Sequence, residues 1–236
     1  MRQSSIVLLS GGLDSLASFH WASQNTDLVF GLTFDYGQRA AKNEIDSAAK
    51  ICRHYDIKHV VIDLPWYATL KSNALTDPSF KLPEPKSGEL NDPYFTKASA
   101  MSVWIPNRNG VFINIAAAYA ENWMASLVIV GFNREEAETF PDNSGEFSRV
   151  ASEFLHYSTN GKVKLSAPMQ EKNKTEIVQW MMEVGASHEL PLQDVWSCYR
   201  GSEKGKMCGV CESCARLKRG LVGAGAGEWL EKLFGN

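Results

Sequence analysis

The chain has 236 residues, of which 44% are hydrophobic and 22% charged, with a formal net charge of −3. This composition is typical of a globular protein whose core is large enough to fold without disulfides or a metal. The slightly acidic balance does not indicate a nucleic-acid partner, since such proteins usually carry a basic stripe. The first apolar run is too short for a signal sequence or a membrane span, so we expect a cytoplasmic protein with no membrane contact.

The first 65 residues alternate strand and helix patterns. Short apolar runs predict strands at 6–9, 28–34 and 59–64, and helical spacing predicts helices at 15–24 and 40–55. Repeated strand–helix–strand units favour a parallel sheet with helices on both faces. We therefore expect a Rossmann-like α/β fold.

Residues 72–107 interrupt this alternation. The stretch is polar and holds five of the nine prolines. Such a composition does not favour a packed helix, and long loops in compact domains are often lids. We expect a flexible insertion here, which is either a mobile flap near the active site or an ordinary surface loop.

The alternation resumes after residue 107. The pattern predicts strands at 127–131 and 163–166, a polar loop at 132–145, and helices at 111–124, 146–157 and 173–185. Asn173, followed three residues later by Glu176, matches a capping box and marks the start of the last of these helices. We expect one nucleotide-binding α/β domain over residues 1–190 and a C-terminal segment over residues 191–236.

A glycine-rich loop, Ser-Gly-Gly-Leu-Asp-Ser at positions 10–15, follows the first strand and opens the first helix. Glycines let the backbone approach a ligand, and the N–H groups of a helix N-terminus bind anions. The ending of a Walker loop and the third glycine of a dinucleotide fingerprint are both missing. The loop resembles the PP-loop of ATP pyrophosphatases, which implies cleavage of ATP between its α and β phosphates. The alternative is a tight turn that uses two glycines.

Nucleotide binding is expected at this loop, at its flanks and at the ends of two further strands. The residues are Leu8, Leu9, Ser10, Gly11, Gly12, Leu13, Asp14, Ser15, Leu16, Ala17, Ser18, Asp35 and Gly131. Asp35 lies at the carboxyl end of the second strand, where doubly wound sheets bind ligands, and is a candidate for nucleotide or metal binding. An Asp that begins a turn is the alternative.

Four of the five cysteines lie close together near the C-terminus: Cys198, Cys208, Cys211 and Cys214. Cys-x-x-Cys spacing lets a turn present two thiolates to one tetrahedral ion, and four thiolates fill its coordination shell. We therefore expect one structural zinc in this segment. An iron–sulfur cluster and a redox dithiol are the alternatives. Cys52 has apolar neighbours on a helix and is expected in the core.

Together these motifs resemble the 7-cyano-7-deazaguanine synthase family within the PP-loop ATP pyrophosphatases. The likeness covers nearly the whole chain. It rests on residues 9–15, 35–39, 72–76, 106–109, Pro168 with 174–177, and 196–199 with the three remaining cysteines.

The resemblance implies an adenine nucleotide alpha hydrolase-like fold and an ATP-dependent carbon–nitrogen ligase of queuosine and deazapurine biosynthesis. Such a ligase adenylates 7-carboxy-7-deazaguanine, uses ammonia to form an amide, and activates the amide again to give the nitrile. The resemblance also implies Mg²⁺, a structural zinc and a homodimer. By match to the motifs, the catalytic residues are Asp14, Ser15, Lys174 and Arg108, the last two as stabilisers of phosphate charge. For Lys174, a solvated helix face is the alternative.

The chain departs from the family pattern over residues 131–147. The family carries an aspartate and then Ser-Gly-Tyr-Pro-Asp-Cys-Arg, whereas this chain keeps only the Pro-Asp and Glu-Phe pairs at 141–142 and 146–147. In the family this loop lies near the deazapurine. The alternatives are therefore a PP-loop enzyme that adenylates another carboxylate, a protein or an RNA, and a zinc-ribbon binding module with an inactive nucleotide fold. An RNA thiolase needs a catalytic cysteine, and only Cys52 is spare.

Overall fold

The computed structural model describes residues 2–70, 72–185, 189–202 and 205–234. In these residues five strands form a single sheet in the order β3-β2-β1-β4-β5, and every pairing is parallel. The strands are β1 (Ser4–Leu8), β2 (Asp27–Asp35), β3 (Lys58–Asp63), β4 (Leu127–Ile129) and β5 (Lys164–Ser166). The expected Rossmann-like class is confirmed.

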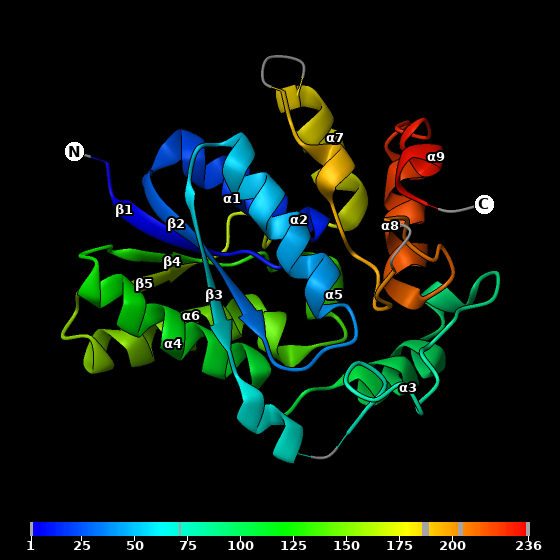
Figure 1. Cartoon of the computed structure of the whole chain (residues 1–236), viewed down its shortest axis with the longest axis horizontal. Coiled ribbons are helices and arrows are strands. Elements are labelled where there is room, and N and C mark those ends of the chain that lie inside the picture. Colours follow the sequence, from blue (N-terminus) through cyan, green and yellow to red (C-terminus); the bar gives the residue numbers. More distant parts are fainter. Residues whose placement is uncertain (1, 71, 186–188, 203–204, 235–236) are drawn as a thin grey trace.

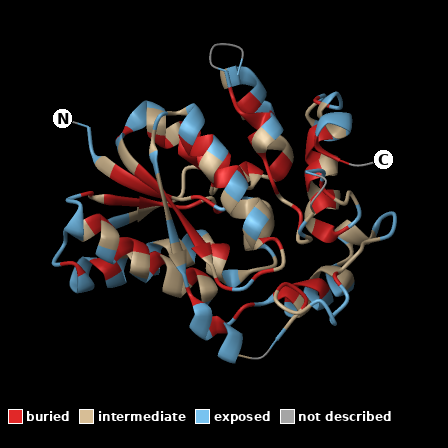
Figure 2. Ribbon diagram, in the orientation of Figure 1, coloured by how far each residue is buried: buried red, intermediate tan, exposed pale blue. Residues whose placement is uncertain are grey.

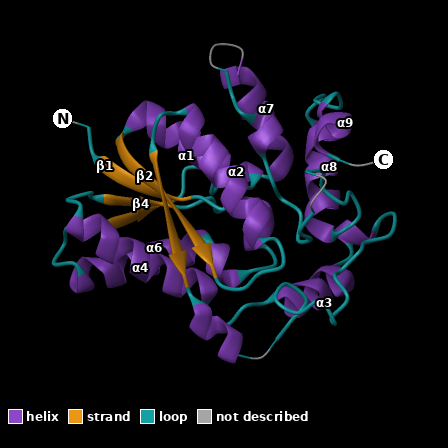
Figure 3. Cartoon of the chain, in the orientation of Figure 1, coloured by secondary structure: helices purple, strands orange, loops and turns teal. Residues whose placement is uncertain are grey.

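Helices cover both faces of this sheet (Figures 1 and 3). They are α1 (Leu13–Asn25), α2 (Ala41–His54), α3 (Pro93–Val103), α4 (Arg108–Asn122), α5 (Arg134–Ala137), α6 (Gly145–Ser158), α7 (Lys174–Gly185), α8 (Glu212–Gly223) and α9 (Trp229–Leu233). Short 3-10 turns span Pro65–Thr69, Glu89–Asn91, Pro141–Asn143 and Leu192–Asp194. The helices α1 and α2 pack on one face of the sheet, and α4 and α6 pack on the other.

The sheet separates two apolar cores (Figure 2). Because successive strand residues point to opposite faces, Val7 of β1 joins the core under α1 whereas its neighbour Ile6 joins the core under α4. Cys52 is 1% exposed in the first core, which confirms its assignment as a core residue. Each large apolar side chain buried in this way contributes roughly 1.5–3 kcal/mol.

The C-terminal segment shares the first core. Leu217 and Leu221 of α8 belong to the same buried cluster as Leu13 and Ile177. The C-terminal segment thus packs against the α/β domain through a common core. The division of the chain into two domains at residue 190 stays a prediction. No helix in the described ranges is both long enough and apolar enough to cross a membrane.

The expectation that 72–107 holds no packed helix is wrong. Helix α3 lies within it, and Ser99 and Val103 are buried. Asp92 caps the helix, since its Oδ1 accepts a hydrogen bond from Tyr94 N at 2.9 Å, and Pro93 occupies the first position, where proline is favoured. Tertiary packing outweighs the proline-rich composition because Ser99 donates a hydrogen bond to Glu212 at the start of α8. A flap role for the insertion stays a prediction.

The strand order reverses between β1 and β4, because β2 and β3 extend the sheet on one side and β4 and β5 on the other. Such a switch point leaves a crevice at the carboxyl ends of the strands, where open α/β sheets bind ligands. Gly131, just after β4, lets this edge approach α1 closely. A Cβ on Gly131 would lie 2.9 Å from Ser15 N, so a side chain there would displace the first turn of α1.

Candidate active site

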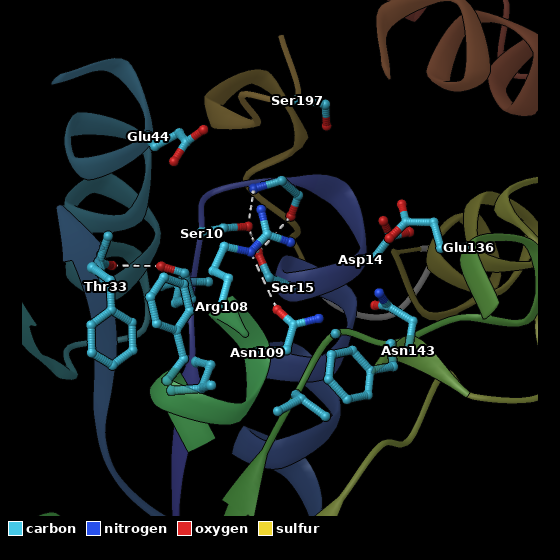
Figure 4. A pocket seen from close by; sticks show the side chains of 18 of the residues that line it. Ser10, Asp14, Ser15, Thr33, Glu44, Arg108, Asn109, Glu136, Asn143 and Ser197 are labelled. Carbon is cyan, nitrogen blue, oxygen red and sulfur yellow. Dashed lines mark hydrogen bonds between the residues drawn. The ribbon is translucent and has the colours of Figure 1, made fainter. Parts of the chain in front are cut away.

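A cavity opens at the switch point of the sheet (Figure 4). It brings together much of the expected set: Leu8, Leu9, Ser10, Gly12, Asp14, Ser15, Arg108, Gly131 and Lys174 all line it. These residues come from the end of β1, the start of α1, the start of α4, the end of β4 and the start of α7. The geometry thus joins the glycine-rich loop to both basic residues expected to be catalytic.

The remaining expected residues do not line the cavity: Gly11, Leu13, Leu16, Ala17, Ser18 and Asp35. Leu16 and Ala17 are core residues, and Ser18 Oγ donates a hydrogen bond to Val130 O at 3.2 Å. Asp35 serves a turn, because its Oδ1 accepts a hydrogen bond from Gly37 N at 2.9 Å. Direct nucleotide contacts of these residues stay predictions.

The loop presents backbone amides to the cavity. Gly12 is the N-cap of α1 and has no side chain to satisfy the first-turn N–H groups. Gly11 adopts a φ of +81°, and a Cβ there would lie 2.6 Å from Ser47 Oγ, so the turn requires glycine. Ser10 Oγ donates a hydrogen bond to Ser15 Oγ at 3.2 Å, which places both hydroxyls beside the amides. Amides and hydroxyls gathered at a helix N-terminus form an anion site.

Beside the loop lies a buried ion pair. Lys174 is 6% exposed, which excludes a solvated helix face, and its Nζ pairs with Asp14 Oδ2. Glu136 Oε1 lies 3.5 Å from the same ammonium. Burial alone lowers the pKa of Lys174, but Asp14 and Glu136 outweigh burial and raise that pKa above its usual value. Lys174 is therefore charged at neutral pH.

The Asp14 carboxyl lies in a strongly desolvated position. Burial raises the pKa of Asp14 to about 6, although the Lys174 ammonium lowers it in part. Its second oxygen, Oδ1, is buried and has no hydrogen-bond partner within the described residues. A buried polar atom of this kind calls for a ligand. Together with the nearby Glu136 carboxylate, it fits the hard oxygen donors that Mg²⁺ prefers.

The opposite end of the cavity is aromatic. The rings of Phe34 and Phe112 stack with centroids 4.1 Å apart, and Arg108 Nη1 lies within 3.5 Å of Tyr36 Oη. Glu44 reaches in from α2, and burial raises its pKa to about 7 although hydrogen bonding from Gln38 and the charge of Arg108 lower it. Flat apolar surface with a few polar groups suits a heteroaromatic ring.

Several lining residues were missed by sequence reasoning: Glu44, Asn109, Glu136, Asn143, Ser197, Tyr199 and Ser213. Glu136 lies in the stretch that departs from the family pattern and that we expected to be a polar loop. That stretch instead contains α5, which Asn133 caps by accepting a hydrogen bond from Glu136 N at 2.9 Å. Asn133 is followed three residues later by Glu136, which is the spacing of a capping box. This spacing could have predicted the helical turn.

The four clustered cysteines converge as expected. Their sulfurs all lie within 4.8 Å of one another, with Cys198 Sγ 4.0 Å from Cys211 Sγ and Cys208 Sγ 3.9 Å from Cys214 Sγ. Zn–S bonds of 2.3 Å in a tetrahedron require sulfurs about 3.8 Å apart. The sulfurs thus fit a single tetrahedral ion. A [4Fe–4S] cluster would bind each thiolate to a different iron, and a [2Fe–2S] cluster would divide the four thiolates between two irons, so either cluster would need a wider arrangement.

An ion-pair cluster joins the helix after these cysteines to the loop after β4. Arg216 of α8 pairs with Glu135 at 2.6 Å and with Glu212 at 2.6 Å, and all three side chains are nearly buried. Arg219 also pairs with Glu135. Because Glu135 adjoins Glu136, these ion pairs connect α8 to the turn that carries the carboxylate facing Lys174.

The family model described as "Queuosine biosynthesis protein QueC" matches residues 4–225. The chain belongs to the QueC family. Three similar proteins carry the name 7-cyano-7-deazaguanine synthase. That of Pelotomaculum thermopropionicum is 49% identical over 221 residues and covers 94% of this chain and 97% of its own length. Those of Desulforamulus reducens and Methanosarcina barkeri are 45% and 43% identical and cover 94% and 98% of this chain, and 94% and 98% of their own lengths.

Proposed function

We propose that the chain is an ATP-dependent ligase that converts 7-carboxy-7-deazaguanine and ammonia to 7-cyano-7-deazaguanine in queuosine biosynthesis. The observation that carries the proposal is the cavity in which the glycine-rich loop meets the buried pair of Lys174 and Asp14. Membership of the QueC family and the shared name of its relatives support the acceptor.

The reaction proceeds in two activations. A carboxylate oxygen attacks the α-phosphorus of ATP, pyrophosphate leaves, and an acyl adenylate forms. Ammonia then attacks the carbonyl carbon, and AMP and a proton leave to give the amide. The amide oxygen attacks a second ATP, and loss of pyrophosphate, AMP and two protons leaves the nitrile. No redox partner is needed.

The chain's own groups stabilise the charge that moves in these steps. The amides at the start of α1, with Ser10 and Ser15, bind phosphate oxygens, and Lys174 stabilises the charge that builds up as pyrophosphate leaves. Arg108 at the start of α4 lies in the same cavity and supplies a second positive charge. The aromatic end around Phe112 takes a flat base.

Two metals fit the residues present. Asp14 and Glu136 would hold Mg²⁺, which neutralises phosphate charge when bound. Cys198, Cys208, Cys211 and Cys214 would hold one structural Zn²⁺ per chain. Metal analysis of purified protein should find about one zinc per chain, and the Cys211→Ser variant should lose both the zinc and thermal stability. A Cys211→Ser protein with unchanged zinc and melting temperature would rule out the zinc site.

The test of function is an incubation of the purified protein with ATP, Mg²⁺, ammonium and 7-carboxy-7-deazaguanine, followed by mass spectrometry. We expect the nitrile, with two AMP and two pyrophosphate molecules per nitrile. ATP consumption only with another carboxylate, a protein or an RNA would favour the second candidate, a PP-loop adenylating enzyme with a different acceptor. The altered stretch over residues 131–147, which places Glu136 in the cavity, is the observation that keeps this candidate open. The homodimer, the cytoplasmic location and the lack of a nucleic-acid partner stay predictions.

A further inference from the structure

We propose that Ser197 binds a phosphate of the nucleotide, so that the cysteine segment (residues 196–214) completes the glycine-rich loop. The proposal rests on the function proposed above and extends it to a residue that lies 184 positions beyond the loop. Ser197 belongs to the Trp-Ser-Cys-Tyr motif at 196–199, and neither the loop nor the metal site accounts for its hydroxyl.

Ser197 lies directly over the first turn of α1. Its Oγ accepts a hydrogen bond from Leu13 N at 3.4 Å and lies 3.6 Å from the position that a Cβ on Gly12 would take. Ser197 Oγ therefore lies beside the amides at which an anion oxygen would meet the helix N-terminus. The Ser197 oxygen thus acts as a distant cap for a helix whose own N-cap residue, Gly12, has no side chain.

The backbone around Ser197 is fixed from several sides. Trp196 N donates a hydrogen bond to Gly11 O at 2.8 Å, and Trp196 Nε1 donates one to Cys198 O at 3.1 Å. Ser197 N contacts Met207 Sδ at 3.2 Å. A side chain on a backbone held in this way loses little conformational freedom when a ligand binds. Its hydrogen bond to the ligand therefore contributes most of its free energy to binding.

The hydroxyl of Ser197 has a donor to spare. A serine hydroxyl carries one donor and two acceptor sites. The Leu13 amide uses an acceptor site, and within the described residues no acceptor is found for the O–H. Ser197 also lines the cavity, and Figure 4 shows it on the upper side of the view, across from Asn109 and Asn143. A phosphate oxygen beside Ser197 Oγ would accept the Ser197 O–H, while the Leu13 N–H stays bonded to the serine oxygen.

The next residue, Cys198, is the first of the four clustered thiolates. Phosphate binding by Ser197 therefore tightens the same segment that holds the metal. Because coupling between two binding sites is reciprocal, a bound nucleotide should retain the metal, and the metal should favour the nucleotide.

The experiment measures binding of ATP with Mg²⁺ by calorimetry, without any acceptor, in the wild-type chain and in Ser197→Ala, Ser197→Thr and Ser23→Ala. Ser197→Ala loses one hydrogen bond to a charged phosphate, so its affinity for ATP should be about tenfold lower than that of the wild type. Ser197→Thr keeps the hydroxyl and should bind within about twofold of the wild type. Ser23, at the other end of α1, donates only to His20 O at 2.8 Å, so Ser23→Ala should bind like the wild type.

Unchanged affinity of Ser197→Ala in a wild-type background that binds ATP would overturn this proposal and leave the proposed function intact. A wild-type chain that binds no ATP would overturn both. A second measurement uses only the wild-type chain. At equilibrium with a zinc-selective chelator, more zinc should stay bound to the chain when ATP and Mg²⁺ are present. Equal zinc occupancy with and without nucleotide would contradict the coupling.

Discussion

The two ends of the cavity differ in chemistry. At one end Asp14 and Lys174 form a nearly buried ion pair beside the glycine-rich loop, with the half-buried Glu136 next to it. At the other end the rings of Phe34 and Phe112 offer a flat apolar surface. Fixed charges stabilise charge that develops during a reaction, whereas a flat surface binds a ring equally before and during the reaction. Substitutions at the charged end should therefore lower kcat, and substitutions at the aromatic end should raise KM.

The substitution with the largest expected effect is Asp14→Asn, at the charged end of the cavity. The change keeps the size of the side chain but removes the charge paired with Lys174 and a ligand for the cation, so turnover should fall about 10³-fold. It should also lower stability by about 3 kcal/mol, because the Lys174 ammonium stays buried. Pyrophosphate release and thermal melting measure the two effects. Asp46→Asn, in an exposed pair with Lys42, is the control and should change neither. If Asp14→Asn released pyrophosphate at the wild-type rate, the charged end of the cavity would have no part in catalysis.

The support of the charged end can be tested through Arg216. Arg216→Met leaves Glu135 and Glu212 without their shared buried partner and should cost about 3–5 kcal/mol in the free energy of unfolding. The matched control is Arg219→Met. Arg219 also pairs with Glu135 but is 36% exposed, so its loss should cost less than about 1 kcal/mol. Denaturant unfolding measures the free energy of unfolding of both variants. Equal losses of this free energy would show that the burial of an ion pair does not decide how much it stabilises the fold.

The aromatic end is tested by Phe112→Leu, which keeps most of the apolar volume but removes the ring. Loss of ring stacking should raise the KM for one of the two ring-bearing substrates about fivefold and leave kcat nearly unchanged. Steady-state kinetics with each substrate varied in turn gives both constants. Phe154→Leu, exposed on α6, is the control. A fall in kcat with both KM values unchanged would contradict the division between the two ends.

The smallest expected effect concerns pH and Glu44. Its pKa in the folded chain is raised to about 7 from the usual 4.5, so the folded state keeps a proton that the unfolded state has already lost. The contribution of Glu44 to stability is therefore present below about pH 4.5 and is lost as the pH rises to about 7. Because the Glu44 side chain is only half-buried, solvent screening weakens the effect, and Glu44→Gln should flatten the dependence of melting temperature on pH by an amount equivalent to about 1 kcal/mol. Melting curves from pH 4.5 to 8 give the comparison with Glu153→Gln, an exposed control. Parallel profiles for the wild type and Glu44→Gln would contradict the buried titration.

The sequence predicted the features that depend on neighbours along the chain. The loop at positions 10–15 lies where strand and helix patterns placed it, and the capping box is confirmed, because Asn173 Oδ1 accepts from Glu176 N at 2.9 Å and Glu176 Oε2 accepts from Asn173 N at 2.7 Å. The proline-rich composition of 72–107 does not predict helix α3, although the Asp-Pro pair at 92–93 is a favourable helix start.

Residues brought in from a distance were also missed. Ser197 approaches the loop from the far end of the chain, and Glu136 is placed by a turn inside an unfamiliar stretch. Asp35 lies at the end of its strand as expected, and its carboxylate accepts a hydrogen bond from Gly37 N, while its contact with a nucleotide or a metal stays a prediction. Local patterns cannot show which side chains meet across the sheet.

The hydrogen bond from Trp196 N to Gly11 O has a consequence for protein synthesis. The ribosome makes the glycine-rich loop long before Trp196 and Ser197, and N-terminal parts of a chain fold first as they emerge. The residues that complete the loop, and the arginines of α8 that hold Glu135, are made later. A nascent chain that ends before α8 therefore carries an incomplete cavity, and we expect no ATP turnover from it.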